Sequence, residues 1–252
     1  MSDLDLIIGV HSVAAALKNP KRNIKKLVAT EEGRDELRKK CDFSKVDVQL
    51  VSSHKLQEEA KKSLQAMGLD YQRAPSGVFL LAEKLPDREV KELYDLVLEA
   101  PRRILCLDQI TDVHNGAAIL RTASFYGVDT VVLPGKKSFG ATPTYFRIAS
   151  GAHEFLNLFK VNNLSKTLSK LKELNTLAIG LSERADQELK GALVKKHSGS
   201  VALVLGKEET GISHAVMRVL DHQMSIKSQG VIQSLNVSVA AAISMEKCFG
   251  IS

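Results

Sequence analysis

The chain has 252 residues, of which 44% are hydrophobic and 25% are charged, as in an ordinary globular protein of one or two domains. No apolar run reaches the roughly 18 residues that a membrane-spanning helix needs. The first residues, Met-Ser-Asp-Leu-Asp, are acidic and do not suit a secretory signal peptide. These features argue against a membrane protein and predict a cytoplasmic one.

The basic residues are unevenly distributed along the chain. The formal net charge is +6, and between Lys18 and Lys40 nine Lys or Arg residues stand against four Asp or Glu residues. A solvated helical face would explain this run as well as contact with RNA phosphates would. The run by itself leaves both interpretations open.

The cysteine and histidine patterns indicate neither a disulfide framework nor a metal site. Cys41, Cys106 and Cys248 are far apart and lie outside any CxxC pair, so we expect reduced thiols that pack as small apolar side chains. The seven histidines form no HxH or HExxH motif, and no bound metal is expected.

The first 85 residues alternate helix and strand signals, which predicts a small N-terminal α/β domain. Helices are predicted at residues 12–17, 35–41 and 56–64. Strands are predicted at residues 26–29, 46–50 and 77–81. The polar stretch 84–88, which contains Pro86, is the predicted linker.

Residues 86–252 show a longer alternation of strands and helices. Helices are predicted at residues 90–97, 117–126 and 164–171, and strands at residues 104–107, 128–133 and 176–181. The first of these helices carries an apolar stripe, and Pro101 follows it. Strands that alternate with helices form a parallel sheet that is covered on both faces.

The last fifty residues place glycine loops at the ends of predicted strands. Residues 201–205 are an apolar run that ends at Gly206, and Gly211 closes the loop that follows. A second short apolar piece is followed by Gly230, and residues 234–236 open a segment of helical length. In an α/β protein, such loops build a ligand crevice at the carboxyl ends of the strands.

Two common nucleotide sites do not fit this stretch. Gly206 and Gly211 have the spacing of a P-loop, but Ile212-Ser213 follows where Lys-Ser or Lys-Thr is required. The sequence also lacks GxGxxG, so a dinucleotide site of the usual kind is not expected.

Three motifs resemble those of the SpoU/TrmH methyltransferases, a family of the SPOUT superfamily. The first is Asp108 followed by His114-Asn115-Gly116-Ala117-Ala118-Ile119-Leu120-Arg121-Thr122-Ala123. The second is Gly206-Lys207-Glu208-Glu209-Thr210-Gly211, and the third runs from Ile226 through Gly230 to Ser234-Leu235-Asn236-Val237-Ser238. The resemblance covers residues 103–250, and Ile8-Gly9-Val10-His11-Ser12-Val13 fits the usual start of the family's substrate-binding domain.

The resemblance implies an α/β fold of two domains. Residues 1–85 would be an RNA substrate-binding domain. Residues 86–252 would be a SPOUT-type methyltransferase domain, with a parallel sheet, helices on both faces and a trefoil knot over about residues 201–250. The resemblance also implies S-adenosylmethionine as the cofactor, RNA as the partner, and a homodimer in which residues 134–145 form one side of the substrate cleft. It implies neither a metal nor a membrane.

The same motifs imply the site residues. Those implied in catalysis are Asn115, Arg121, Glu208, Ser234 and Asn236. Those implied in cofactor binding are Leu205, Gly206, Ile226, Gly230, Ser234 and Leu235. A glycine at positions 206 and 230 would let the backbone approach the ligand closely.

Each type of site residue also has a purely structural interpretation. Asn115 and Asn236 can cap helices, as asparagine often does. Arg121 can form a surface salt bridge, Glu208 can be a solvated loop carboxylate, and Leu235 can be part of the core.

Transfer of a methyl group from a sulfonium to a ribose hydroxyl requires that the hydroxyl lose its proton and that the methyl group face it in line. A guanidinium is a poor base, since neutralising a group of pKa about 12.5 at pH 7 costs roughly 7 kcal/mol. A cation that stays charged beside the RNA phosphate and the developing alkoxide would assist the reaction about as much as a base would. The proton could then pass to the RNA or to water.

The leading hypothesis is S-adenosylmethionine-dependent 2′-O-ribose methylation of structured RNA, ribosomal rather than transfer RNA because of the additional N-terminal domain. One alternative is a tRNA 2′-O-ribose methyltransferase of the same family. Another is a non-catalytic RNA-binding protein that keeps the fold, although the presence of all five implied catalytic residues argues against it. With an RNA enzyme in view, phosphate contact becomes the favoured explanation of the basic run at residues 18–40.

Overall fold

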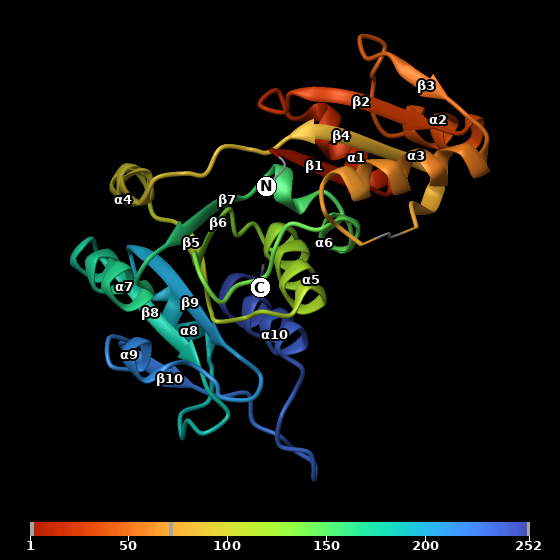
Figure 1. The fold of residues 1–252 in the computed structure, drawn as a ribbon. Coiled ribbons are helices and arrows are strands. Elements are labelled where there is room, and N and C mark those ends of the chain that lie inside the picture. The colour runs from red at the N-terminus through yellow and green to blue at the C-terminus, as the bar shows by residue number, and fades with distance from the viewer. Residues whose placement is uncertain (1–2, 71–72, 251–252) are drawn as a thin grey trace. The chain divides into compact units, whose positions relative to one another are not determined.

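The computed structural model describes residues 3–70 and 73–250, and the chain divides into two compact units (Figure 1). The first unit comprises Met1–Pro86 and Gly140–Phe155, and the second comprises Asp87–Phe139 and Leu156–Ser252. The chain therefore passes from one unit to the other at three points. Residues 140–155 belong to the first unit although they lie, in sequence, between two strands of the second.

The first unit is built on a four-stranded mixed sheet. Its strands are β1 (Leu4–Ile8), β2 (Ile24–Ala29), β3 (Val48–Leu50) and β4 (Val78–Glu83). The order is β1-β4-β2-β3, with β4 antiparallel to β1 and β2, and with β3 parallel to β2. One face is covered by α3 (Ser53–Ala66), which buries Leu56, Ala60 and Leu64. Their spacing of four residues places these side chains on one stripe of the helix.

The remaining helices of the first unit are α1 (Val10–Lys18), α2 (Glu31–Arg38), α6 (Pro143–Ala149), η1 (Pro75–Gly77) and η2 (Ala152–Glu154). Both α1 and α6 pack on β1, and α1 also contacts η2. Gly151 lies so close to α1 that a Cβ there would stand 2.5 Å from the Cβ of Ala15. Its φ of +93° is in the left-handed region, where glycine is favoured. A small residue on each side thus permits the close approach of η2 to α1.

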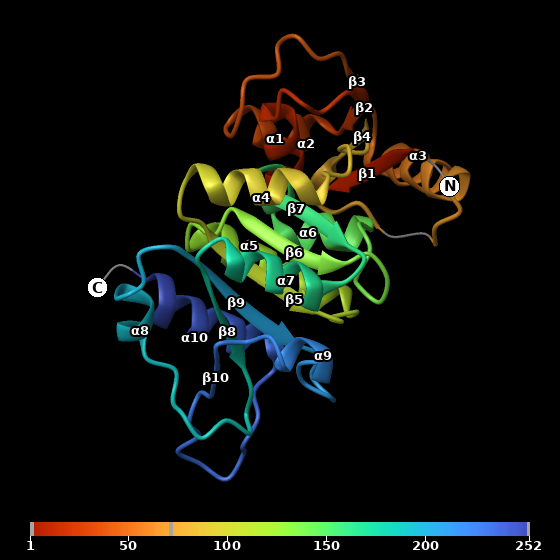
Figure 2. The same ribbon diagram turned by 90° about the vertical axis from the view of Figure 1, so that its left-hand side faces the viewer.

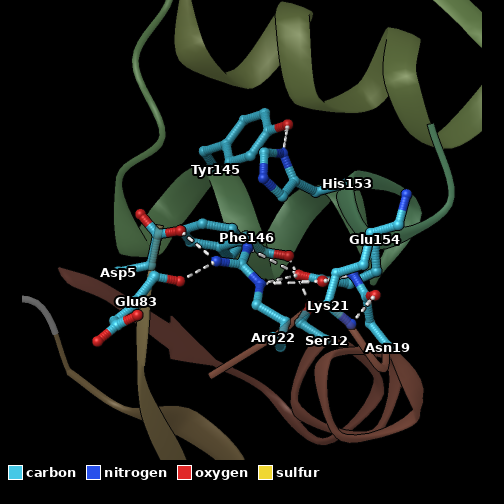
Figure 3. Close-up of polar contacts among 10 residues, drawn as sticks. All are labelled: Asp5, Ser12, Asn19, Lys21, Arg22, Glu83, Tyr145, Phe146, His153 and Glu154. Atoms are coloured by element: carbon cyan, nitrogen blue, oxygen red, sulfur yellow. Dashed lines mark hydrogen bonds and ion pairs between the residues drawn. The ribbon is translucent and has the colours of Figure 1, made fainter. Parts of the chain in front are cut away.

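A buried ionic cluster holds η2 to the rest of the first unit (Figure 3). The Arg22 side chain is fully buried, and its Nη1 donates to Asp5 Oδ2 and to the Glu83 carbonyl oxygen, each at 2.7 Å. Its Nη2 donates to Glu154 Oε1 at 2.9 Å, and Asn19 Nδ2 donates to Glu154 Oε2 at 2.8 Å. Burial raises the pKa of Asp5, and Arg22 opposes that effect. Acceptors surround the guanidinium, as a buried arginine requires.

Two further contacts beside this cluster join α6 to α1 and to η2 (Figure 3). The Ser12 hydroxyl donates to the Phe146 carbonyl oxygen at 2.6 Å. The Tyr145 hydroxyl lies 2.8 Å from His153 Nδ1, and burial raises the pKa of that tyrosine. The position of α6 is therefore set by buried polar contacts as well as by apolar packing.

The second unit is a six-stranded sheet in which all neighbouring strands are parallel (Figure 2). Its strands are β5 (Arg103–Asp108), β6 (Thr130–Pro134), β7 (Asn157–Val161), β8 (Thr176–Leu181), β9 (Ser200–Gly206) and β10 (His222–Met224), in the order β10-β8-β9-β5-β6-β7. The central strands β5 and β9 are almost continuous buried runs, as expected for strands covered on both faces. Asp108 pairs in register with Gly206, so the carboxyl ends of β5 and β9 meet at one edge.

Helices cover both faces of the parallel sheet (Figures 1 and 2). On one face, α4 (Val90–Glu99), α7 (Leu164–Glu173) and α9 (His214–Met217) contribute Leu93, Leu168 and Val216 to a buried apolar cluster. On the other, α5 (Val113–Phe125) and α10 (Val237–Phe249) pack against each other, and α8 (Gly191–Lys195) contacts α10. Within residues 3–70 and 73–250, no helix has the length and apolarity needed to cross a membrane.

The predicted parallel sheet with helices on both faces is confirmed, as are most of its elements. The strand predicted at residues 176–181 has those bounds, and the helix predicted at residues 90–97 extends to Glu99. The strands β1 and β7 and the helix α6 are not evident in the sequence pattern. The trefoil knot stays a prediction.

The interpretation of Asn115 as a helix cap is wrong. The helix α5 begins at Val113, four residues before the predicted start, and its cap is Asp112. The Asp112 side chain accepts a hydrogen bond from the Asn115 backbone N–H at 2.7 Å. Because a neighbouring aspartate already caps the helix, the Asn115 side chain is available for other contacts.

The basic run at residues 18–40 is not a uniform phosphate-binding surface. Lys25 and Lys26 form ion pairs of 2.6 and 2.7 Å with Glu83 and Glu59. Arg22 is buried in the cluster described above. Arg22 is therefore not available to RNA, acidic partners compete for the two lysines, and phosphate contact by the rest of the run stays a prediction.

The Arg22 cluster makes a prediction about stability. Replacing Arg22 with Met leaves two buried carboxylates without their cation, which should lower the free energy of unfolding of the first unit by about 3–5 kcal/mol. Urea-induced unfolding followed by circular dichroism measures the loss. Arg38→Met is the matched control, because the Arg38 side chain is 63% exposed, and it should change stability by less than about 0.5 kcal/mol. Equal stability of the two variants would contradict the structural role of Arg22.

Candidate active site

A pocket lies in the second unit at the carboxyl ends of the parallel strands. Its walls come from the ends of β8 and β9, from the loop 206–212, and from the segment that precedes α10. Open α/β sheets bind ligands at this edge. Six residues that the sequence motifs imply line the pocket, namely Leu205, Gly206, Glu208, Ile226, Ser234 and Leu235.

The loop after β9 folds back tightly on itself. Lys207 and Gly211 exchange backbone hydrogen bonds of 3.1 and 2.7 Å, and Gly211 has a left-handed φ of +71°. A Cβ on Gly206 would lie 2.2 Å from the carbonyl carbon of Gly211. Glycine at position 206 is thus required by crowding from the protein's own backbone, whereas the sequence analysis attributed it to the approach of a ligand.

Asp108, at the end of β5, anchors the far side of this loop. Its carboxylate is buried, and Oδ2 accepts a hydrogen bond from the Ser213 backbone N–H at 2.7 Å. Within the loop, a hydrogen bond from Lys207 lowers the pKa of the Glu209 carboxyl. Lys207 therefore pairs with Glu209, and the neighbouring Glu208 carboxylate turns to different partners.

Glu208 joins the starts of two helices. Its Oε1 accepts hydrogen bonds from Asn115 Nδ2 and from Asn236 Nδ2, each at 2.8 Å, and from the Val237 backbone N–H at 3.2 Å. Asn236 Nδ2 also donates to Asn115 Oδ1 at 3.0 Å. The structure thus brings together three of the implied catalytic residues, and Glu208 is not merely a solvated loop carboxylate.

Asn236 has a second role as the cap of α10. Its Oδ1 accepts hydrogen bonds from the Ser238 backbone N–H at 2.9 Å and from the Ser238 hydroxyl at 2.6 Å. With the oxygen engaged in capping, the amide NH₂ is directed to Glu208 and Asn115. Capping is therefore one part of what this residue does.

The other implied residues are distributed differently. Leu235 is 50% exposed, so its interpretation as plain core is wrong. Gly230 lies in an exposed loop, with open space where a Cβ would stand. Arg121 lies six residues beyond Asn115 on α5, about 9 Å along the helix axis. Its side chain is exposed.

The structure adds a pocket wall that the sequence analysis missed. Leu181, the last residue of β8, and residues 182–184 directly after it line the pocket. Because β8 runs parallel to β9, its carboxyl end lies at the same edge of the sheet. The strand predicted at residues 176–181 could therefore have identified this wall, since residues that follow the strands of a parallel sheet lie at its carboxyl edge.

The lining suits a flat, partly polar ligand such as an adenosine derivative. Leu205, Ile226 and Leu235 offer apolar contact, and Ser182 and Gln233 offer hydrogen-bonding groups. The walls thus combine apolar side chains with polar groups that can fix the orientation of a ligand. Within residues 3–70 and 73–250, no group of three or more His, Cys, Asp and Glu side chains is placed to hold a metal ion.

Comparison with known families gives matches along both units. Residues 102–246 match the family described as SpoU rRNA Methylase. Residues 6–64 match the family described as RNA 2′-O ribose methyltransferase substrate binding.

Curated relatives match over nearly their whole length. The 23S rRNA (guanosine-2′-O-)-methyltransferase RlmB of Ralstonia nicotianae is 34% identical over 244 residues, which is 96% of this chain and 94% of the relative. The protein of the same name from Shewanella oneidensis is 33% identical over 247 residues, or 96% of each chain.

A solved structure shares the fold. The SpoU methyltransferase AviRb from Streptomyces viridochromogenes, in complex with the cofactor AdoMet, has a TM-score of 0.72. The match covers 97% of this chain and 89% of that one at 18% sequence identity. At that identity, the likeness concerns the fold alone.

Crowding at Gly206 makes a prediction about ligand binding. Gly206→Ala forces its Cβ against the Gly211 backbone and should open the loop, so calorimetry with S-adenosylhomocysteine should detect no binding. The unchanged protein should bind with a dissociation constant on the order of micromolar. Gly140→Ala is the control, because a Cβ there meets nothing within 4 Å. Unaltered affinity in Gly206→Ala would show that this loop does not shape the ligand site.

Proposed function

The chain belongs to the SpoU rRNA methylase family, and we propose that it transfers a methyl group from S-adenosylmethionine to a ribose 2′-hydroxyl of ribosomal RNA. The observation that carries this proposal is the cluster of Glu208, Asn115 and Asn236 at the rim of the pocket. Residues from three distant segments converge there on the edge of the sheet where ligands bind.

Ribosomal RNA is the proposed substrate because of the relatives. Those from Ralstonia nicotianae and Shewanella oneidensis are both named as 23S rRNA methyltransferases, and the matches span 94% and 96% of their lengths. The match of residues 6–64 to a substrate-binding family supports an RNA-binding role for the first unit. The family that residues 6–64 match is described as RNA 2′-O ribose methyltransferase substrate binding, which agrees with a ribose 2′-hydroxyl as the methyl acceptor.

The pocket residues have roles in holding the cofactor. The loop at Leu205-Gly206 and the segment at Ser234-Leu235 both line the pocket, and Ile226 adds an apolar side chain to the lining. Gly230 belongs to the loop before Ser234, and we assign it to the cofactor-binding residues as well. S-adenosylmethionine, when bound, supplies the electrophilic methyl group.

Glu208 positions the residues around the reacting groups. By accepting hydrogen bonds from Asn115 and Asn236, it holds the first turns of α5 and α10 in a fixed relation. Ser234 lies two residues before Asn236 on the pocket wall. A preorganised set of hydrogen-bonding groups costs no reorganisation when charge develops during the reaction.

Arg121 supplies positive charge to the RNA. Its side chain is exposed and has no ion-pair partner within residues 3–70 and 73–250. We assign it to the phosphate beside the target ribose and to the developing alkoxide, where it remains charged. The proton leaves the hydroxyl to the RNA or to water, since neutralising a guanidinium at pH 7 costs roughly 7 kcal/mol.

The proposed assembly is a homodimer formed through α5 and α10. Phe125 on α5 is 82% exposed, and Val239 on α10 is 47% exposed. Ile232, in the loop that leads to α10, is 75% exposed. Exposed apolar side chains on helices that pack together are typical of a protein-protein contact, and twofold symmetry is the commonest arrangement of such contacts.

Arg121 provides the test of the proposed function. Arg121→Ala should lower the rate of methyl transfer to an unmodified 23S rRNA transcript by about 10²–10³-fold, the usual effect of losing one transition-state donor. Binding of S-adenosylhomocysteine should stay within a few-fold, because Arg121 faces the RNA. Arg121→Lys should also be impaired, since it keeps the charge but loses the planar fork that matches a phosphate. Near-normal turnover by Arg121→Ala would remove Arg121 from the active site.

The assembly gives a second prediction. Light scattering should give a particle of about twice the 27.5 kDa chain mass. Phe125→Glu places a charge on the proposed contact and should shift the protein toward the monomer. A monomeric wild-type protein at working concentration would contradict the proposed dimer.

A further inference from the structure

A second cavity is lined entirely by residues of the first unit. Its volume is about 480 Å³, and its walls come from the start of α1, the end of α2, η1 and α6. Residues of the segment 9–12, which the sequence analysis noted as the start of the substrate-binding domain, form one wall. Arg147 and Ser150 also line it, and they come from residues 140–155, which belong to the first unit.

The side chains of this cavity carry an excess of positive charge. Lys40 and Arg147 line it together with the imidazole of His11. The lining also includes the carboxylate of Glu36, but a hydrogen bond from Lys39 engages that carboxylate and lowers its pKa. Two cations therefore remain for a ligand, and the chemistry of the cavity favours an anion.

Backbone groups add to this preference. The helix α1 begins at Val10, and its cap is Gly9, which has no side chain to satisfy the first backbone N–H groups. A Cβ on Gly9 would lie 3.8 Å from Arg147 Cγ, so the arginine stem runs past the start of this helix. The free N–H groups and the positive end of the helix dipole act in the same direction as the two cations.

The cavity is a fixed feature of the first unit rather than a chance gap. Ser76 and Ser150, which both line it, have left-handed φ angles of 63° and 52°, which are uncommon for residues other than glycine. The helix that carries Arg147 is held by the bond from Ser12 to the Phe146 carbonyl and, through η2, by the buried Arg22 cluster (Figure 3). The backbone at Arg147 is therefore held in place beside the cavity.

We propose that this cavity binds a phosphate group of the RNA backbone, with Arg147 and Lys40 as its cationic ligands. The inference rests on the proposed function, in which RNA is the substrate. A phosphate suits this lining because Lys40 and Arg147 supply two cations beside the start of α1. The cavity localises phosphate contact to one place in the first unit, whereas most of the basic run at residues 18–40 is engaged by acidic partners.

The test measures binding of an unmodified 23S rRNA transcript by the full-length protein over a range of salt concentrations. Each contact with a phosphate contributes close to one unit to the slope of log K against log salt concentration. Arg147→Gln and Lys40→Gln should each weaken binding about tenfold at 0.1 M salt and reduce the slope by about one unit. Turnover at saturating RNA and the affinity for S-adenosylhomocysteine should stay within about twofold of wild type, because both residues lie in the first unit.

Arg38→Gln is the matched control, since Arg38 is an exposed arginine of the first unit that does not line the cavity. A titration with inorganic phosphate, followed by NMR, shows whether the cavity binds the free anion as well as the RNA backbone. The proposal is overturned if both cavity variants bind the transcript with the affinity and salt slope of Arg38→Gln, even if phosphate itself binds. It also falls if the wild-type protein does not bind the transcript. If the wild-type protein binds the transcript in an Arg147-dependent way but transfers no methyl group, the phosphate site stands and the proposed function fails.

Discussion

One oxygen atom, Glu208 Oε1, determines how the candidate active site is assembled. It accepts hydrogen bonds from the Asn115 and Asn236 side chains and from the Val237 backbone, so the loop after β9 and the starts of α5 and α10 are tied together. The parallel sheet makes this possible, because it delivers the ends of β5 and β9 to one edge. Asp112 caps α5 and Asn236 Oδ1 caps α10, which leaves both amide groups free to meet the carboxylate. The site is therefore a product of helix capping and strand register acting together.

The first unit depends on a different constraint, the burial of Arg22. A buried guanidinium must be surrounded by acceptors, and one of them, Glu154, comes from a segment 132 residues away. This pairing explains why residues 140–155 belong to the first unit although β6 and β7 belong to the second. The same pairing fixes the helix that carries Arg147, and so connects a buried structural charge with the proposed phosphate contact.

Features encoded by local sequence were predictable, and features that depend on distant partners were not. The bounds of β8, the apolar run of β9 and the glycine loop all follow from short patterns. The contact between Asn115 and Glu208 spans 93 residues, and the family motifs implied only that both residues belong to one site. No local pattern marks the pairing of Arg22 with Glu154, or the crowding of Gly206 by the Gly211 backbone. The interpretation of Asn115 as a helix cap failed because α5 already begins at Val113 with Asp112 as its cap, so Asn115 lies inside the first turn.

If this site methylates a ribose of ribosomal RNA and Glu208 holds the site together, the modification depends on the gene and on that carboxylate. Nucleotide-resolution mapping of 2′-O-methylation in 23S rRNA, from the parent strain and from a strain that lacks the gene, measures this dependence. One ribose methylated in the parent strain should be unmethylated in the deletion strain. A plasmid copy of the wild-type gene should restore the methyl group, and a Glu208→Ala copy expressed at the same level should not. Identical methylation maps in the parent and deletion strains, or full restoration by Glu208→Ala, would show that this site does not carry out the reaction as proposed.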